Sequence, residues 1–324
     1  MQVALIRALC VAALLPLLGG QAFAVSAYVT NEKGNSITIL DVDRMEAIKT
    51  FPVGKRPRGI ALSPDGARLY VCTSDDDVIQ VYDTASLALL GRIATSDPEQ
   101  IVLSPDGARI YVANEDDNLI SIFDAQTRKS IAEVPVGVEP EGVAVSPDGK
   151  TIVATSETTN MAHFIDAAAR KIVGNVLVGA RPRFAQFKPD GSELWVSSEV
   201  GGAVAVIDPV QKKLIAKVGF EIPGLTKEQA QPVGIRMTAD GKTAFIALGP
   251  ANRVAVVDTA TKKVERYLLV GQRVWQLALT PGDKYLLAVN GLTNDVSIID
   301  VTARKVLKSV QVGALPWGVA VAPK

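Results

Sequence analysis

An all-β fold made of repeated small sheets is predicted by two observations in this 324-residue sequence. The first is the tetrapeptide Ser-Pro-Asp-Gly, which stands at residues 63–66, 104–107 and 146–149, with diverged copies at 188–191, 238–241 and 280–283. The second is an aspartate at the end of an apolar segment in every repeat. These aspartates are Asp41, Asp83, Asp124, Asp166, Asp208, Asp258 and Asp300. A period of about 42 residues, with a hairpin signal in each unit, predicts a radial array of β-sheets.

Each repeat contains four predicted strands. In the first complete repeat, a strand at 59–62 runs into the Ser-Pro-Asp-Gly turn and a second strand follows at 68–72. A polar loop leads to a third strand ending at Asp83, and a fourth strand ends before the Pro that opens the next repeat. Four short strands in about 42 residues are typical of one propeller blade. We expect the strand-end aspartates to cap turns rather than to form a ring of metal ligands.

The counts of the two motifs predict how the array closes. Six turns accompany seven third strands, so one blade must be split. The C-terminal segment 317–324 reads as a first strand, while residues 27–31 and 36–40 read as a second and a third. Pairing the two ends removes exposed strand edges. The predicted fold is a seven-bladed β-propeller of four-stranded blades, one domain over residues 25–324, with the closing blade split between the N- and C-termini.

The first 24 residues have the pattern of a secretory signal peptide. Arg7 is followed by the apolar run 8–18 and by Ala-Phe-Ala at 22–24, which predicts cleavage after Ala24. An uncleaved anchor is the alternative. No later run is apolar and long enough to cross a bilayer. We therefore expect a protein exported to the periplasm without a membrane span after cleavage.

Composition excludes several classes of partner and site. The 34 basic and 34 acidic residues balance, which disfavours nucleic acid and anionic membranes as partners. Cys72 is the one cysteine outside the predicted signal peptide, so no internal disulfide is expected. It lies in a strand pattern typical of a buried, inert thiol. One histidine, His163, also lies in a strand pattern, and His/Cys zinc clusters are unavailable.

The residue after the blade-opening Pro is expected to ring one mouth of the central channel. In chain order these residues are Arg58, Glu99, Glu141, Arg183, Val233, Trp275 and Trp317, with Val274 in place of the Pro before Trp275. Two acidic blades thus stand between two arginine blades, and two tryptophans are neighbours. We consider the charged residues and tryptophans candidates for a channel-mouth binding site, in which the aromatic rings stack on a small ligand or partner. The alternative is that the tryptophans plug the mouth as part of the core.

Further acidic residues gather near the acidic blades on the same predicted face. They are Asp75, Asp76, Asp77, Asp97, Glu115, Asp116, Asp117 and Glu139. Three interpretations remain open: an arginine–carboxylate network that holds the blades in register, a docking patch for a basic partner, and an oxygen-ligand site for a cation such as calcium. No spaced calcium-loop motif is present, and no cofactor is otherwise predicted.

An eight-residue excess around residues 220–231 lies between two blades, on the same face as the ring. Such loops often carry binding functions, although a neutral insertion is the alternative. The opposite face carries the Ser-Pro-Asp-Gly turns and basic doublets such as Arg128-Lys129, which we interpret as solvated turns. We therefore expect function on the face that carries the blade-connecting loops.

Three segments resemble the YVTN-type β-propeller repeat: residues 28–31, 70–73 and 111–114. Val53-Gly54, the blade-opening Pro and the Ser-Pro-Asp-Gly turn belong to the same pattern. More narrowly, the predicted signal peptide, blade count and insertion resemble exported propellers that accompany PQQ-dependent (quinoprotein) alcohol dehydrogenases and an ABC transport system. The resemblance implies a non-catalytic periplasmic binding or scaffolding role. Its implied partner is a quinoprotein dehydrogenase, a cytochrome or a transporter component.

An enzyme remains the alternative function. Propeller lactonases hold a metal with carboxylates and asparagines at the channel, and this chain offers Glu99, Glu141, Asn31 and Asn114 for that role. No nucleophile-elbow motif accompanies His163. The alternative is therefore a metal-dependent hydrolase or lactonase at the channel mouth, with no catalytic residue assigned.

Overall fold

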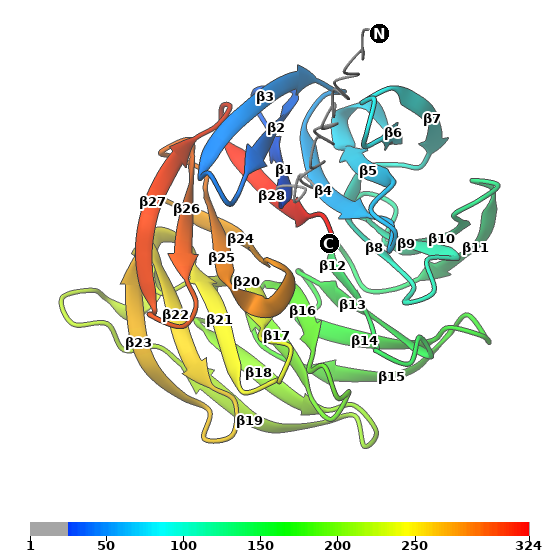
Figure 1. The fold of residues 1–324 in the computed structure, drawn as a ribbon. Helices are drawn as coiled ribbons and strands as arrows, with labels where there is room; N and C mark the ends of the chain where they lie inside the picture. Colours follow the sequence, from blue (N-terminus) through cyan, green and yellow to red (C-terminus); the bar gives the residue numbers. More distant parts are fainter. Residues whose placement is uncertain (1–24, 324) are drawn as a thin grey trace, which may run out of the picture.

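The computed structural model describes residues 25–323, and the predicted signal peptide lies outside them. Seven four-stranded antiparallel sheets stand side by side around a central channel (Figure 1). This arrangement confirms the predicted all-β, seven-bladed propeller. The innermost strand of each blade packs against the innermost strand of the next. Among the residues described, no helix has the length and apolar character needed to cross a membrane.

The blades are numbered from the closing one, and their strands are given from the channel outward. Blade 1 contains β28 (Pro316–Val321), β1 (Ser26–Asn31), β2 (Ser36–Asp41) and β3 (Glu46–Pro52). Blade 2 contains β4 (Pro57–Leu62), β5 (Arg68–Thr73), β6 (Val78–Asp83) and β7 (Leu89–Ala94). Blade 3 contains β8 (Pro98–Leu103), β9 (Arg109–Asn114), β10 (Leu119–Asp124) and β11 (Ser130–Pro135). Blade 4 contains β12 (Pro140–Val145), β13 (Thr151–Ser156), β14 (Met161–Asp166) and β15 (Lys171–Leu177).

Blade 5 contains β16 (Pro182–Phe187), β17 (Leu194–Ser198), β18 (Ala203–Asp208) and β19 (Lys213–Gly219). Blade 6 contains β20 (Pro232–Met237), β21 (Thr243–Leu248), β22 (Arg253–Asp258) and β23 (Lys263–Leu269). Blade 7 contains β24 (Val274–Leu279), β25 (Tyr285–Asn290), β26 (Asp295–Asp300) and β27 (Lys305–Gln311). Four short 3₁₀ turns complete the structure: η1 (Ser74–Asp76), η2 (Lys227–Gln229), η3 (Gly249–Ala251) and η4 (Pro281–Asp283).

The closing blade is built from both ends of the chain, as predicted. Strand β28 pairs antiparallel with β1, with Tyr28 opposite Ala320 and Val29 opposite Val319. Figure 1 shows the red C-terminal strand beside the blue N-terminal one. The Thr30 hydroxyl also accepts a hydrogen bond from the Gly318 amide at 2.9 Å. The pairing leaves neither terminal strand as a free inner edge.

The repeated motifs owe their recurrence to turn geometry. In the first Ser-Pro-Asp-Gly turn, Gly66 has a φ of 70°, and the Ser63 hydroxyl accepts a hydrogen bond from the Arg68 amide at 2.9 Å. The strand-end aspartates cap turns, as predicted: Asp83 accepts the Ser86 amide at 2.8 Å and Asp124 accepts the Thr127 amide at 2.8 Å. Both motifs therefore determine structure rather than chemistry.

The hydrophobic core lies mainly between neighbouring blades. Trp195 of blade 5 is fully buried and packs in one cluster with Ile235 and Ile246 of blade 6. Cys72 is a free, fully buried thiol in the cluster between blades 2 and 3. Because each sheet contributes both faces to such clusters, the blades form a rigid ring. The innermost strands line the central channel.

Candidate functional site

The channel mouth on the face of the blade-connecting loops is closed by buried side chains. Six of the seven predicted ring residues are at most 9% exposed, and only Trp275 is half-buried. They are the second residues of β4, β8, β12, β16, β20, β24 and β28. The structure thus brings the predicted ring together, but its charged groups contact one another. We call the seven ring residues, together with Glu157, Glu199, Arg181 and Arg273, the mouth network.

Two arginines flank two glutamates over four neighbouring blades of the ring. Arg58 forms an ion pair with Glu99 and lies 3.9 Å from Glu141. The Arg183 Nη1 atom lies 2.6 Å from the Glu141 carboxylate. Burial alone would lower the pKa of Arg58 and Arg183, but the facing carboxylates raise the pKa of both guanidinium groups above its ordinary value. The four side chains join blades 2, 3, 4 and 5 through charge.

The two ring carboxylates have opposite pKa shifts. Burial, and then the charge of Glu141, hold the pKa of Glu99 well above its usual range. Burial also disfavours the charge of Glu141, but Arg183 and Arg58 offset it and lower its pKa. Glu141 is therefore the charged member, and Glu99 holds a proton more readily. Interacting acids at short range divide their protons in this way.

Two further glutamates, which were not among the residues predicted from the sequence, complete the mouth network. Arg183 lies 2.8 Å from Glu157 and 2.7 Å from Glu199. Arg181 lies 2.7 Å from Glu157, and Arg273 lies 2.7 Å from Glu199. A signal for both was present, because the residue after the second strand is glutamate in four repeats. These glutamates are Glu32, Glu115, Glu157 and Glu199.

The two tryptophans lie against arginines of the same network. The Arg58 guanidinium carbon is 5.1 Å from the ring centroid of Trp317. Arg273 is 4.2 Å and Arg183 is 6.0 Å from Trp275. Cation–π contacts are stronger where the groups are shielded from water, so these contacts help to hold the tryptophan rings at the mouth. Trp317 is 2% exposed and belongs to the plug, whereas the half-buried Trp275 is also accessible from outside.

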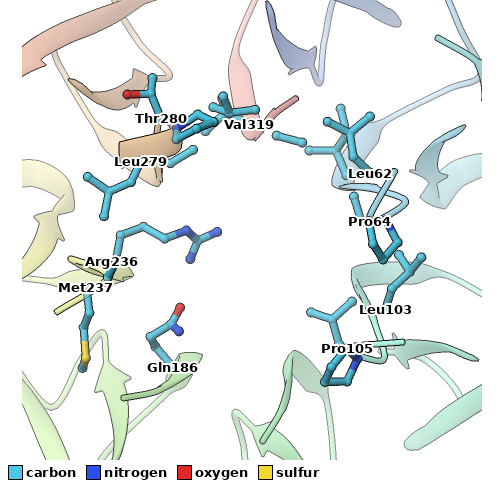
Figure 2. Close-up of a pocket in the computed structure, with 18 of the residues that line it drawn as sticks. Leu62, Pro64, Leu103, Pro105, Gln186, Arg236, Met237, Leu279, Thr280 and Val319 are labelled. Atoms are coloured by element: carbon cyan, nitrogen blue, oxygen red, sulfur yellow. The ribbon is translucent and has the colours of Figure 1, made fainter. Parts of the chain in front are cut away.

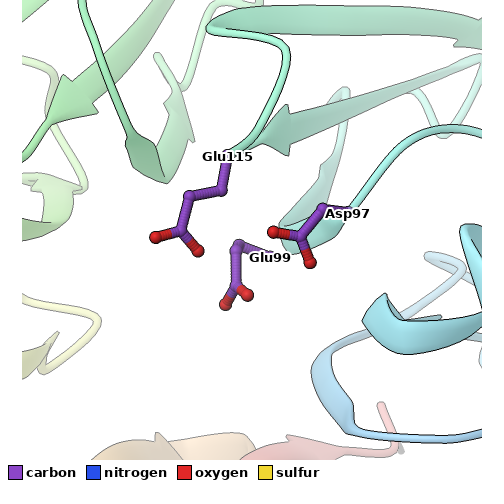
Figure 3. Close-up of side chains that lie close together, drawn as sticks. All are labelled: Asp97, Glu99 and Glu115. Carbon is purple, nitrogen blue, oxygen red and sulfur yellow. The ribbon is translucent and has the colours of Figure 1, made fainter.

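An acidic depression of about 480 Å³ lies beside the plug, between blades 2 and 3. Its lining residues are Arg56, Ser74, Asp75, Asp77, Asp97, Glu115 and Asp116. The carboxylates of Asp97, Glu99 and Glu115 have oxygens within 4.8 Å of one another, and Figure 3 shows them converging. Carboxylates gathered in this way attract cationic groups. We call this surface the acidic depression.

One arginine offsets part of that negative charge. Arg56 lies 3.1 Å from Asp97, 3.0 Å from Glu99 and 3.9 Å from Asp75. Burial, which Arg56 offsets only in part, raises the pKa of Asp97. Burial and the charge of Glu141 raise the pKa of Glu115. The depression therefore still has more carboxylates than cations, and a bound cation would stabilise their ionised forms.

The remaining predicted acidic residues lie outside the lining of this depression. Asp76 accepts a hydrogen bond from the Lys55 amide at 2.7 Å and so holds a loop. Glu139 accepts a hydrogen bond from the Thr158 hydroxyl. Asp117 is exposed. The residues predicted for partner docking thus divide into five that line the depression and three that surround or support it.

The insertion at 220–231 folds back onto the propeller. Phe220, Ile222 and Ala230 are buried in the cluster that contains Trp195. The Glu221 amide donates a hydrogen bond to the Tyr267 hydroxyl at 3.0 Å. The insertion is therefore anchored by its apolar residues.

Both ring nitrogens of His163 have hydrogen-bond partners within the protein, so this residue has a structural role. Its Nε2 accepts the Gly137 amide at 3.1 Å, and its Nδ1 lies 2.7 Å from the Asn175 side-chain oxygen. Burial lowers its pKa, which favours this neutral form. The two asparagines considered for a metal are also engaged: Asn31 donates to Thr38 at 3.0 Å and Asn114 donates to Thr95 at 2.7 Å.

The fold places the chain in the class of seven-bladed β-propellers, and in this one buried ion pairs lie at one channel mouth. Residues 116–292, more than half of the chain, match the family model described as the Choice-of-anchor I domain. The chain belongs to this family. Residues 25–96 match a second model, described as a lactonase with a seven-bladed β-propeller. A comparison with curated proteins found no match.

Solved structures share the fold at low sequence identity. The chain is similar to Kuenenia stuttgartiensis hydrazine synthase, with 22% identity and a TM-score of 0.78, over 89% of this chain and 99% of that one. A functionally unknown protein from Desulfotomaculum acetoxidans has 16% identity and a TM-score of 0.79, over 92% and 99%. A putative 6-phosphogluconolactonase from Bacteroides uniformis has 18% identity and a TM-score of 0.77, over 92% and 99%. These likenesses concern the fold.

Proposed function

We propose that this protein is a non-catalytic binding propeller of the periplasm that docks a basic protein partner through the acidic depression. The observation that carries the proposal is the uneven use of charge on this face. In the mouth network the arginines form ion pairs with glutamates. In the acidic depression the carboxylates of Asp75, Asp77 and Asp116 are exposed to solvent, and Arg56 is the one arginine in the lining. Complementary charge accelerates association and selects among partners.

The partner in this proposal is periplasmic. The resemblance to propellers that accompany PQQ-dependent alcohol dehydrogenases and an ABC transport system supports a quinoprotein dehydrogenase, a cytochrome or a transporter component. The anchored insertion at 220–231 would add a fixed rim on the same face. Because the depression is polar, we expect association to weaken steeply as salt rises.

Capture from a periplasmic extract tests this docking. The charge-reversed variant Asp75→Lys/Asp116→Lys should capture the partner at least about tenfold less well, since each reversal replaces attraction by repulsion. Glu133→Lys is the matched control, because Glu133 is an exposed carboxylate on the outer strand of blade 3. Equal capture by wild-type protein and the double variant would refute docking at the depression.

A second candidate is a metal-dependent lactonase, favoured by the match of residues 25–96 to a lactonase model. In this case Asp97, Glu99 and Glu115 would hold a divalent cation through carboxylate oxygens, which hard cations prefer. Titration calorimetry with Ca²⁺, and an assay of 6-phosphogluconolactone hydrolysis, decide between the two. Heat of binding and turnover that both disappear in Glu115→Gln would favour the lactonase, and their absence in wild-type protein would exclude it.

A further inference from the structure

The channel is open on the face of the Ser-Pro-Asp-Gly turns, opposite the mouth network. A cavity of about 710 Å³ lies there, and Figure 2 shows the side chains around its opening. The fifth residue of each innermost strand forms a belt around the channel. In blade order from blade 2 the belt is Ala61, Val102, Ala144, Gln186, Arg236, Ala278 and Ala320. The belt thus consists of five small apolar residues, one glutamine and one charged residue, Arg236.

Arg236 points into this cavity without a carboxylate partner (Figure 2). Among residues 25–323 it forms no ion pair; its Nη1 donates one hydrogen bond, of 2.7 Å, to the Ile235 carbonyl. The guanidinium carbon lies 4.8 Å from the ring centroid of Phe184. A guanidinium has five N–H donors, so most of them remain available to a ligand. Arg58 and Arg183, by contrast, form ion pairs with carboxylates of the mouth network.

The protein keeps this charge although burial opposes it. Desolvation lowers the pKa of Arg236 to about 10, and no neighbouring carboxylate offsets the effect. The group remains charged at neutral pH, because its pKa still lies above 7. The cavity contains one other charged lining residue, Asp283, whose Oδ2 accepts the Ala239 amide at 2.6 Å. An unpaired, partly buried cation of this kind is costly unless an anion binds it.

Polar atoms without partners lie at the inner end. A small cavity of about 70 Å³ is lined there by Arg236, Phe184, Gln276 and Trp317, among others. The Trp317 Nε1 donor and the Gln276 Oε1 acceptor are buried and have no hydrogen-bond partner among the described residues. These two residues are 2% and 4% exposed. Buried polar atoms are usually satisfied by protein, water or ligand, so this end of the channel is built to receive a polar group.

The walls between this polar end and the opening are apolar. They include Leu62, Ile101, Leu103, Leu279 and Val319. A ligand that fits must therefore combine one negative group at the inner end with a hydrocarbon portion toward the opening.

We propose that this cavity binds a monocarboxylate with an apolar tail, its carboxylate held by Arg236 at the inner end and its tail against the apolar walls. The carboxylate fits the planar donor fork of a guanidinium. A phosphate dianion fits less well, since one cation would face two charges and Asp283 adds repulsion near the opening. This site is separate from the acidic depression, so its failure would leave the docking proposal untouched.

Titration calorimetry of the full chain with sodium octanoate tests the proposal. We expect one saturable site in wild-type protein, weaker binding of 1-octanol, which has the same tail but no charge, and no tighter binding of inorganic phosphate. Arg236→Met should weaken octanoate binding at least about tenfold, since it removes the charged hydrogen bonds to the carboxylate. Arg266→Met, an exposed arginine on the outer strand of the same blade, is the matched control and should bind normally.

A second variant guards against a misfolded Arg236→Met protein. Ala320→Leu keeps the arginine but fills part of the belt, and it should also reduce octanoate affinity. Arg236→Met should itself melt no lower than wild type, because a partly buried, unpaired charge is replaced by an apolar side chain. Absence of octanoate binding to wild-type protein, equal binding by wild type and Arg236→Met, or tighter binding of phosphate than of octanoate would overturn the proposal.

Discussion

The guanidinium of Arg183 on β16 lies 2.6 Å from the carboxylate of Glu141 on β12, and both side chains are almost completely buried. The pair joins blades 4 and 5 at the channel mouth. Because Arg183 also contacts Glu157 and Glu199, one cation serves three carboxylates. The innermost strands are thus held together by charge at one mouth and by apolar packing elsewhere. A buried ion pair adds little stability over a well-packed apolar contact, but removal of one partner leaves an uncompensated buried charge.

Replacing Arg183 by Met should destabilise the protein by about 3–5 kcal/mol at neutral pH, since three carboxylates lose their shared cation. Urea unfolding followed by circular dichroism measures the change. Arg44→Met is the control: its ion pair with Glu46 spans 2.9 Å but is 72% and 46% exposed, and its loss should cost at most about 1 kcal/mol. Equal destabilisation by the two variants would contradict the role of burial in the mouth network.

Glu157 should make the stability of the protein depend on pH. Burial raises its pKa to about 7 in the folded protein, although Arg183 and Arg181 oppose the shift. The folded state then holds a proton that the unfolded state releases near its ordinary pKa of about 4.3. This contribution is complete at low pH and is lost as pH rises through about 7.

The Glu157→Gln variant isolates that contribution, since glutamine is neutral at every pH. We expect the free energy of unfolding of wild type to fall relative to the variant between pH 5 and pH 8, measured by urea titration at each pH. A difference between the two proteins that stays constant over this range, or that grows in favour of wild type, would show that Glu157 is already ionised in the folded protein at pH 5.

The sequence predicted the blades because their turns recur, and it predicted the ring because six of the seven ring residues follow the proline that opens a blade and Trp275 follows Val274 at the same position. It did not predict Glu157 and Glu199, whose roles depend on loops from neighbouring blades meeting over Arg183. Arg236 was also missed. The sequence around an arginine in a strand does not indicate whether a carboxylate lies next to it. That Arg236 has no such partner is seen only in the assembled channel.

Strand β28 should be required for the ring to close. Deleting residues 315–324 removes the partner of β1 and exposes the edge on which Tyr28 and Val29 pair. We expect a lower melting temperature, a less cooperative transition and faster proteolysis at the N-terminal strands. Deleting residues 323–324 is the control, because it leaves β28 intact. A synthetic peptide of residues 313–324 should restore protection in trans, and identical melting of the two truncated proteins would refute the closure.

Cys72 should report on opening between blades 2 and 3. The thiol is fully buried, and burial with the nearby charges of Glu99 and Asp97 raises its pKa well above the usual value. Since the thiolate is the reactive form, a Cys10→Ser protein should not react with a disulfide reagent when folded and should release one equivalent of product in denaturant. Adding Ser130→Cys, at an exposed strand position, should give one rapid equivalent in the folded state. If Cys72 reacted as fast as that control, these two blades would separate on the time scale of labelling, and the mouth network could not be holding them in register.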